Sequence, residues 1–218
     1  MAIPTHEFDI IIVGSGLFGC TVAQVIAEYT QKRILLIEKR EHLGGNSFSE
    51  YYEDSGIEVH KYGSHLFHTS NEEVWKYVNM FSKFNSYVHR VKTVHKDVFY
   101  SLPINLQTLS QFFGRTFTPK SASEFLNSQV PKNTDLSGGD FETRAILSVG
   151  KQLYEAFFHN YTEKQWQTNP KNLPGDVFAR IPIRLNFDDR YFSDKYQALP
   201  VNGYTSIIEN MLKYPNIE

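Results

Sequence analysis

The sequence predicts an α/β protein in which one parallel βαβ unit is followed by α+β insertions and the start of an antiparallel sheet. Residues 8–13 and 33–38 are apolar runs rich in β-branched side chains, which are typical of buried parallel strands. A glycine-rich turn at 14–19 and helix-spaced apolar residues at 21–29 lie between them. This order of strand, turn, helix and strand is that of a Rossmann-like unit.

Beyond residue 70 the apolar spacing favours helices over strands. Helices are expected at residues 71–84, 105–113, 121–129, 141–159 and 205–213. The loosely alternating residues 87–102 predict two strands around Lys96-Asp97, and the polar residues 131–140 predict a loop. Because a single βαβ unit gives too few parallel strands for a stable sheet, we expect the fold to be truncated at residue 218.

The composition excludes several functional classes. Hydrophobic residues make up 41% and charged residues 21% of the 218 residues, as in ordinary globular proteins. A formal net charge of -2 gives no electrostatic case for binding nucleic acid or a membrane surface. The single cysteine, Cys20, excludes an internal disulfide, and no apolar run reaches the ~20 residues of a membrane span. Since the N-terminus lacks a signal-peptide pattern, a cytoplasmic protein is expected.

The glycine turn has the spacing G-x-G-x-x-G, at Gly14, Gly16 and Gly19. Directly after a strand and at the start of a helix, this spacing indicates a dinucleotide site, because the free N–H groups there favour a pyrophosphate. Glu38 is expected to accept hydrogen bonds from the ribose, which disfavours NADP. Gly44-Gly45-Asn46 either lets a second loop approach the cofactor or makes a simple turn. These residues leave NAD, FAD and an empty α/β unit open.

Three histidines, His60, His65 and His68, lie close together in the sequence. Structural zinc normally takes four Cys or His ligands, and no cysteine is near them. Their spacing is also unlike a standard catalytic zinc site. We therefore expect no metal, favour separate packing roles for the three side chains, and keep contact with a cofactor as a further reading.

Several segments together resemble the UDP-galactopyranose mutases of the short bacterial type, in order and in spacing. They are Gly-Ser-Gly-Leu-Phe-Gly (14–19), Ile-Glu-Lys-Arg (37–40), Leu-Gly-Gly-Asn (43–46), His-Lys-Tyr-Gly-Ser-His-Leu-Phe-His-Thr (60–69), Ser-Leu-Pro-Ile-Asn-Leu (101–106), Tyr-Thr-Glu-Lys-Gln-Trp (161–166) and Arg-Ile-Pro-Ile-Arg-Leu-Asn-Phe-Asp-Asp-Arg-Tyr-Phe (180–192). The first two segments occur in many flavoenzymes, whereas those at 60–69, 161–166 and 180–192 are much more specific.

The resemblance implies an isomerase that binds FAD and acts with the flavin reduced. Such enzymes interconvert UDP-galactopyranose and UDP-galactofuranose, for cell-surface polysaccharides, through an adduct between flavin N5 and the sugar, without net redox change. The cofactor carries the hard chemistry, and the protein supplies position and electrostatics. The implied partner is UDP-galactose; neither nucleic acid nor a membrane span is implied, and a homodimer is compatible with the family.

The resemblance also assigns cofactor-binding residues to this sequence. They are Gly14, Ser15, Gly16, Phe18, Gly19, Glu38, Lys39, Gly45, Asn46, His65 and Leu66. His68 matches a catalytic histidine that packs beside the flavin ring near N5, and Gly63 lies in the same flexible segment. These assignments are implied by the family alone.

The substrate-binding residues that it assigns are Phe157, Phe158, Tyr161, Thr162, Trp166, Arg180 and Tyr191. Aromatic faces at 157, 158 and 161 suit a flat uracil ring. Arg180 matches a catalytic arginine on a mobile loop, whose guanidinium holds the substrate diphosphate and stabilises departing UDP. On the residues alone, Phe157 is as readily a core side chain and Arg180 a surface arginine.

The expected organisation has three parts. Residues 1–70 form an FAD-binding Rossmann-like segment, residues 71–170 a mostly helical substrate domain with a short hairpin, and residues 171–218 an incomplete mobile loop, sheet segment and return helix. Gln167 and Asn202 stand where the family commonly has glycine. Since family members continue well beyond residue 218, we expect this chain by itself to be an inactive fragment.

Two other functions remain open at this point. An amine-oxidase-like flavin oxidoreductase would share residues 8–46, but it gives no reason for the segments at 161–166 and 180–191. A non-catalytic nucleotide-binding protein would bind UDP without turning it over.

Overall fold

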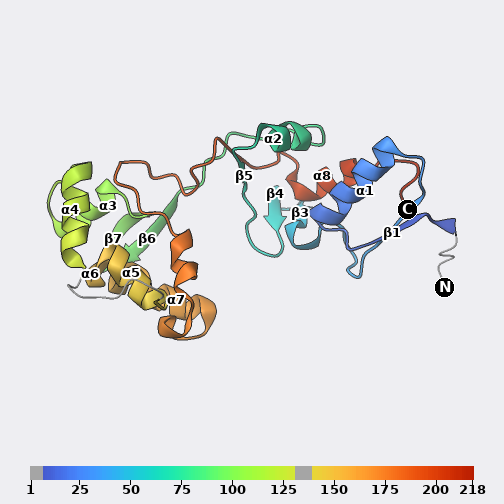
Figure 1. The fold of residues 1–218 in the computed structure, drawn as a ribbon. Helices are drawn as coiled ribbons and strands as arrows, with labels where there is room; N and C mark the ends of the chain where they lie inside the picture. Colours follow the sequence, from blue (N-terminus) through green and yellow to red (C-terminus); the bar gives the residue numbers. More distant parts are fainter. Residues whose placement is uncertain (1–6, 131–138) are drawn as a thin grey trace. The chain divides into compact units, whose positions relative to one another are not determined.

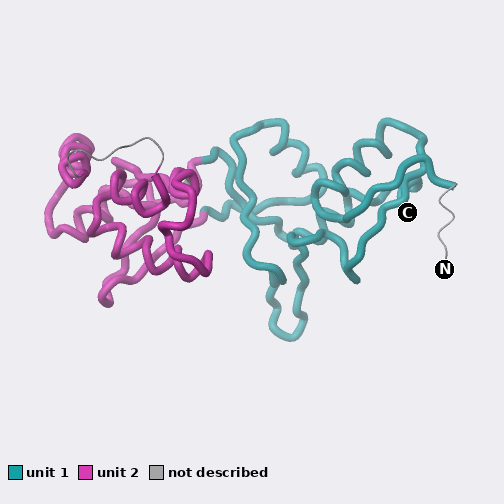
Figure 2. The backbone as a smooth tube through the Cα atoms, turned by 60° about the horizontal axis from the view of Figure 1, so that its bottom comes forward, with its two compact units in different colours: residues 1–88, 194–218 teal, residues 89–193 magenta. Residues whose placement is uncertain are grey.

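A computed structural model describes residues 7–130 and 139–218, and for Arg180 only the backbone. The chain divides into two compact units (Figures 1 and 2). Met1–Val88 and Asp194–Glu218 belong to the first unit, and His89–Ser193 form the second. None of the described helices combines the length and apolar character needed to cross a bilayer.

The first unit contains the expected βαβ arrangement. Its elements are β1 (Ile10–Val13), α1 (Leu17–Tyr29) and β2 (Ile34–Ile37). β1 and β2 are parallel, with Ile10 opposite Ile34. The last residues of the chain run parallel to β2 on its other side, since the Ile34 N–H donates to the Asn216 carbonyl at 2.8 Å. The Rossmann-like class predicted from the glycine spacing is confirmed.

β1 is less buried than its sequence predicts. Ile10 and Ile12 pack in the cluster that contains Ala23 of α1. Ile11 and Val13, on the opposite face, are 45% and 81% exposed. The prediction of a buried strand is wrong for one face of β1, because the described chain places a helix against only its other face.

The described residues of the first unit form four further strands and two more α-helices. They are β3 (Ser49–Tyr52), β4 (Ile57–His60), β5 (Phe67–Thr69), α2 (Glu72–Val78), β8 (Tyr196–Ala198) and α8 (Gly203–Met211). β3 pairs with β4 and β5 with β8, both antiparallel. The β3–β4 hairpin was not predicted. The helix expected to reach residue 84 ends at Val78, where the chain passes into tighter turns that bury Phe81.

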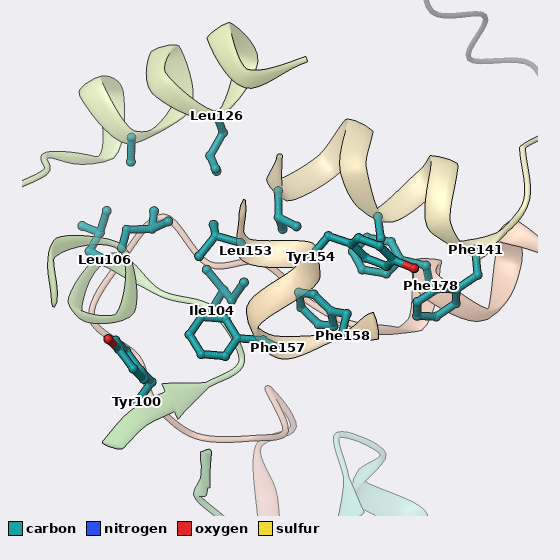
Figure 3. Close-up of a cluster of buried hydrophobic side chains, with 14 of the residues drawn as sticks. Tyr100, Ile104, Leu106, Leu126, Phe141, Leu153, Tyr154, Phe157, Phe158 and Phe178 are labelled. Carbon is teal, nitrogen blue, oxygen red and sulfur yellow. The ribbon is translucent and has the colours of Figure 1, made fainter. Parts of the chain in front are cut away.

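The second unit is a hairpin with helices around one core. Its elements are β6 (Val91–His95), β7 (Val98–Leu102), α3 (Leu106–Phe113), α4 (Pro119–Gln129), α5 (Phe141–Val149), α6 (Lys151–Phe157), α7 (His159–Trp166) and the 3-10 helices η3 (Pro170–Asn172) and η4 (Gly175–Arg180). Buried side chains from β7, α3, α4, α5, α6 and η4 meet in Figure 3. The two strands expected around Lys96-Asp97 are confirmed, since β6 and β7 pair antiparallel with Lys96 and Asp97 at positive φ.

One predicted helix is divided by a glycine. Residues 141–159 were expected to be continuous, but α5 ends at Val149 and α6 starts at Lys151. Gly150 lies between them with φ +82° and ψ 159°, a conformation outside the right-handed helical region. The apolar spacing continues across this break, which is why periodicity alone joins the two helices.

Candidate functional site

In the first unit the glycine turn connects the end of β1 to the start of α1. Gly14 has φ +101° and donates its N–H to the Ile37 carbonyl at 2.7 Å, so the turn begins on the parallel ladder. Gly16 is the N-cap of α1, without a side-chain capping bond and without an acidic residue in the first turn. The first N–H groups of this helix are therefore available to an anion.

Two glycines permit close backbone contacts around this turn. A Cβ on Gly19 would lie 2.0 Å from the Gly14 carbonyl oxygen, which explains why only glycine fits there. A Cβ on Gly45 would lie 3.2 Å from Gly16 Cα. Gly44 donates its N–H to the Ser15 carbonyl at 2.8 Å. The Gly44-Gly45 pair thus packs directly on the first glycine turn.

Glu38 is held by the turn that it faces. Its Oε2 accepts from the N–H and the hydroxyl of Ser15, each at 2.8 Å, and its Oε1 accepts from the Arg40 N–H at 3.0 Å. The Ser15 N–H is the main reason why the pKa of Glu38 is lowered to about 2. Glu38 is therefore ionised at neutral pH and can only accept hydrogen bonds. Ser15 is buried and directs both donors at Glu38.

A pocket of about 410 Å³ opens at this end of the sheet. It is lined by Val13, Gly14, Gly16, Ile37, Glu38, Lys39, Arg40 and Gly45. It thus gathers five predicted cofactor residues where the parallel strands end, the usual ligand position in such sheets. Of the other predicted residues, Phe18 is 83% exposed, and Asn46 accepts from Arg40 Nη2 at 2.8 Å.

Arg40 was missed by the sequence-based site prediction. Its Nη1 is buried and has no hydrogen-bond partner among the described residues. Its guanidinium lies 4.6 Å from the centre of the Tyr62 ring. A buried donor without a partner is costly unless a ligand or water satisfies it. Arg40 therefore adds a fixed positive charge to the pocket wall; its only sequence signal was its place in the Ile-Glu-Lys-Arg segment.

Two of the three clustered histidines pack against a tyrosine. The His60 and His65 rings lie edge-on to Tyr204, with centroids 5.5 and 6.3 Å away. His60 Nδ1 accepts from the His65 N–H at 3.0 Å, and burial lowers the pKa of His60. Leu66 is half-buried. Among the described residues no group of three or more His, Cys, Asp or Glu side chains is arranged to hold a metal ion.

His68 has a different environment on β5. Its side chain is 38% exposed, and its Nδ1 lies 2.8 Å from Asp194 Oδ2. Asp194 Oδ1 accepts from the Ser70 hydroxyl at 2.9 Å. The hydrogen bond from His68, with a smaller contribution from Ser70, holds the pKa of Asp194 below its usual range. Asp194 was not predicted as a site residue, because it lies far from His68 along the chain.

The second unit contains an apolar pocket of about 240 Å³. It is lined by Val91, Lys92, Thr93, Leu102, Pro103, Phe157, Phe158, Tyr161, Ile181, Pro182 and Tyr191. Four predicted substrate residues, those at 157, 158, 161 and 191, therefore line the same pocket. The hairpin, the end of α6, the start of α7 and the segment after η4 build it.

Phe157 and Phe158 belong to both the core and the pocket. They are 6% and 4% exposed. The Phe157 ring centre lies 5.4 Å from that of Phe112, and the Phe158 ring is edge-on to Phe178. Phe158 is therefore a core residue as well as a pocket residue. Tyr161, one helical turn further, is 67% exposed and free to turn its ring toward a ligand.

Thr162 and Trp166 lie outside the pocket lining. Thr162 is buried and donates its N–H to the Phe158 carbonyl, and Trp166 is 52% exposed at the end of α7. The backbone of Arg180 ends η4, and its side chain lies outside the part that the structure describes. Arg184 donates to the backbone carbonyls of Arg190 and Tyr191, which fixes the segment that presents Tyr191.

Lys92 lines the same pocket and was not predicted. Its Nζ donates to the Ser101 hydroxyl at 2.6 Å and lies 3.6 Å from Asp189 Oδ2. Asp189 also accepts from Arg90 at 2.8 Å. Among the described lining residues of the apolar pocket, Lys92 is therefore the cationic one, and the register of the hairpin places it there.

Comparisons with known proteins cover both units. The family model described as UDP-galactopyranose mutase matches residues 156–218, and that described as NAD(P)-binding Rossmann-like domain matches residues 12–81. A probable UDP-galactopyranose mutase of Klebsiella pneumoniae is 43% identical over 211 residues. The chain is related to the UDP-galactopyranose mutases. The resemblance stated from its motifs is thereby confirmed.

The UDP-galactopyranose mutase relatives are longer than this chain. The alignment with the Klebsiella protein covers 96% of this chain and 54% of that one. A dTDP-fucopyranose mutase of Escherichia coli is 42% identical, with 96% and 55% covered. The UDP-galactopyranose mutase of Mycoplasma genitalium is 31% identical, with 98% and 53% covered. The chain thus spans about half the length of the curated relatives it matches.

A solved structure has the same fold. The crystal structure of reduced UDP-galactopyranose mutase matches with a TM-score of 0.73, and covers 97% of this chain and 48% of that one. An oxidoreductase from Methanosarcina mazei matches with a TM-score of 0.55. Sequence identities of 17% and 14% limit both likenesses to the fold. The mutase-family match at residues 156–218 includes all seven predicted substrate residues, from Phe157 to Tyr191.

Proposed function

We propose that this chain forms the FAD-binding and uridine-binding surfaces of a UDP-galactopyranose mutase. The observation that carries the proposal is the apolar pocket of the second unit, in which Phe157, Phe158, Tyr161 and Tyr191 come together. The resemblance had assigned these residues to the nucleotide of the substrate. The match of the mutase family at residues 156–218 supports the same assignment, and an amine-oxidase-like oxidoreductase gives no reason for it.

The pocket of the first unit fits a flavin dinucleotide. Cβ atoms on Gly14 and Gly16 would meet nothing within 4 Å, so the space above the glycine turn is open to a ligand. The N-terminus of α1 and the unpartnered Nη1 of Arg40 both favour an anion there. Glu38 offers an ionised acceptor for ribose hydroxyls. Reduced flavin, when bound, would supply the electron-rich nitrogen that displaces UDP from the sugar.

The residues of the second unit would bind and orient the substrate. The exposed Tyr161 ring gives uracil an aromatic face, and the buried Phe157 and Phe158 rings exclude water behind it. Arg180 would pair with the diphosphate and stabilise the charge of the leaving UDP. Tyr191, fixed by Arg184, would donate its hydroxyl to the same group. Catalysis in this proposal depends mainly on position and charge.

A dTDP-sugar is the second candidate substrate. The Escherichia coli relative at 42% identity is named dTDP-fucopyranose mutase, which favours this reading as much as the other names favour UDP-galactose. Thymine adds a methyl group to the ring that uracil presents, and a largely apolar pocket accepts it readily. Competition between UDP and dTDP for the purified chain separates the two readings, because the cognate nucleotide should bind more tightly.

The proposal also includes a cytoplasmic location and a homodimeric state. The cytoplasmic location is supported by a single cysteine, which is buried in α1. The homodimer is taken from the family resemblance. Light scattering of the purified chain would give its mass in solution and decide between monomer and dimer.

Titration of the chain with FAD tests the proposal in the first unit. Saturable binding, followed by flavin fluorescence, is expected. Glu38→Gln should weaken it about 10- to 100-fold, because a hydrogen bond to a charged acceptor contributes about 1.5–3 kcal/mol and 1.4 kcal/mol is tenfold. Glu50→Gln, on β3 outside the pocket, is the matched control and should bind like the wild type. Equal FAD affinity for all three chains would contradict the assignment of this pocket.

A further inference from the structure

His68 and Asp194 face each other across the β5–β8 pair. In the antiparallel register His68 lies opposite Gln197, and Asp194 precedes β8. His68 Nδ1 lies 2.8 Å from Asp194 Oδ2, a normal hydrogen-bond distance. Gln197 Nε2 donates to the Asp194 carbonyl at 3.1 Å, which ties the backbone of Asp194 to the strand that faces His68.

Both oxygens of the Asp194 carboxylate are occupied. Oδ2 takes the hydrogen bond with His68, and Oδ1 accepts from the Ser70 hydroxyl at 2.9 Å. Ser70 Oγ also accepts from the Lys195 N–H at 3.2 Å. The carboxylate is thus oriented by one side chain on each oxygen, and that orientation fixes which way the His68 ring must turn.

We infer that Asp194 is a positioning residue that holds His68 in the Nδ1–H tautomer, with its lone pair on Nε2. An ionised carboxylate has no proton to give, so the short contact requires Nδ1 to donate. The other ring nitrogen then keeps the lone pair, as in any neutral imidazole. This role rests on the proposed function in so far as His68 acts beside the flavin.

The arrangement has a chemical consequence for His68. A ring whose Nδ1–H donates to a fixed carboxylate presents the lone pair of Nε2 in a defined direction. Without Asp194 no carboxylate determines which ring nitrogen of the 38% exposed His68 side chain carries the proton, so both tautomers would be populated. Asp194 thereby converts an ordinary surface histidine into one with a defined acceptor atom.

Ring-nitrogen NMR of the isotope-labelled chain tests the inference. In the wild type, His68 should show the Nδ1–H pattern as the dominant form, and Asp194→Ala should reduce it to a mixture of both tautomers. Asp194→Asn should retain the Nδ1–H form, because its amide oxygen still accepts the hydrogen bond. A wild-type His68 in the Nε2–H form, or an unchanged pattern in Asp194→Ala, would overturn the inference.

Glu72→Gln provides the matched control in the same region. Both carboxylate oxygens of Glu72 accept hydrogen bonds, from Lys195 and Tyr196, next to Asp194. Its substitution should leave the His68 pattern unchanged; a change equal to that of Asp194→Ala would count against a specific role for Asp194. The NMR experiment needs no flavin, so failure of FAD binding with the Nδ1–H form present would refute the proposed function and leave the positioning of His68 intact.

Discussion

At the scale of a single residue, Glu38 is both a candidate ribose acceptor and a structural hydrogen-bond acceptor. The spacing after the glycine turn predicted a ribose acceptor, and the structure adds that Glu38 accepts three hydrogen bonds from Ser15 and Arg40. Because those donors belong to the turn and to the pocket wall, the carboxylate also fixes the local backbone. The distance of Glu38 from the glycine turn indicated a ribose acceptor. Its hydrogen bonds with Ser15 and Arg40 could not be predicted, because they depend on the pairing of β1 with β2.

These bonds predict an acid sensitivity. The folded-state pKa of Glu38 is about 2, below its ordinary value of 4.5. The stability that ionised Glu38 contributes is therefore complete above pH 4.5 and is lost as the pH falls toward 2. Urea unfolding of the wild type and of Glu38→Gln across this range should show the wild-type advantage shrinking. A stability difference between the two proteins that stays constant with pH would contradict the lowered pKa of Glu38.

At the scale of elements, the sequence predicted features that depend on neighbouring residues, but it did not predict contacts between residues far apart in the chain. The βαβ unit and the β6–β7 hairpin follow from glycine spacing and short-range alternation, so they were predicted. Asp194 and His68 are 126 residues apart, and only the β5–β8 pairing joins them. Lys92 was not predicted to line the pocket because its pocket neighbours Phe157 and Tyr191 lie far from it along the chain. Gly150 was hidden because the apolar residues on both sides kept a helical period.

The end of α7 supplies a prediction at this scale. Gln167 caps the helix with φ +52° and ψ 33°, the left-handed conformation that glycine adopts at such positions. Its Nε2 donates to the Lys164 carbonyl at 2.6 Å. Gln167→Gly and Gln167→Ala both remove this bond, but only glycine relieves the backbone strain. Gln167→Gly should therefore be more stable than Gln167→Ala by about 1 kcal/mol.

Thermal unfolding of the two variants measures this difference. For a chain of this size, about 1 kcal/mol corresponds to a melting temperature higher by roughly 2–4 °C for Gln167→Gly. Equal melting temperatures, or a more stable alanine variant, would show that residue 167 is not held in the left-handed region in solution.

At the scale of the whole molecule, the two candidate pockets lie in different compact units and differ in chemistry. The pocket of the first unit is lined by glycine backbone, Glu38 and Arg40, and that of the second by aromatic rings and Lys92. Composition alone had left the protein without any charge signal, since its net charge is -2. The charged side chains of the two pockets, Glu38, Arg40 and Lys92, are local features that the net charge does not reveal.

Titration of the purified chain with UDP by calorimetry tests the central claim most directly. Saturable binding is expected, and Tyr161→Ala should weaken it by about tenfold or more, because stacking of a base on an aromatic ring contributes about 1–3 kcal/mol. Tyr29→Ala, which removes a 77% exposed tyrosine of the first unit, should leave UDP affinity unchanged. Absence of UDP binding, or equal affinity for the wild type and Tyr161→Ala, would contradict a uridine site in this pocket.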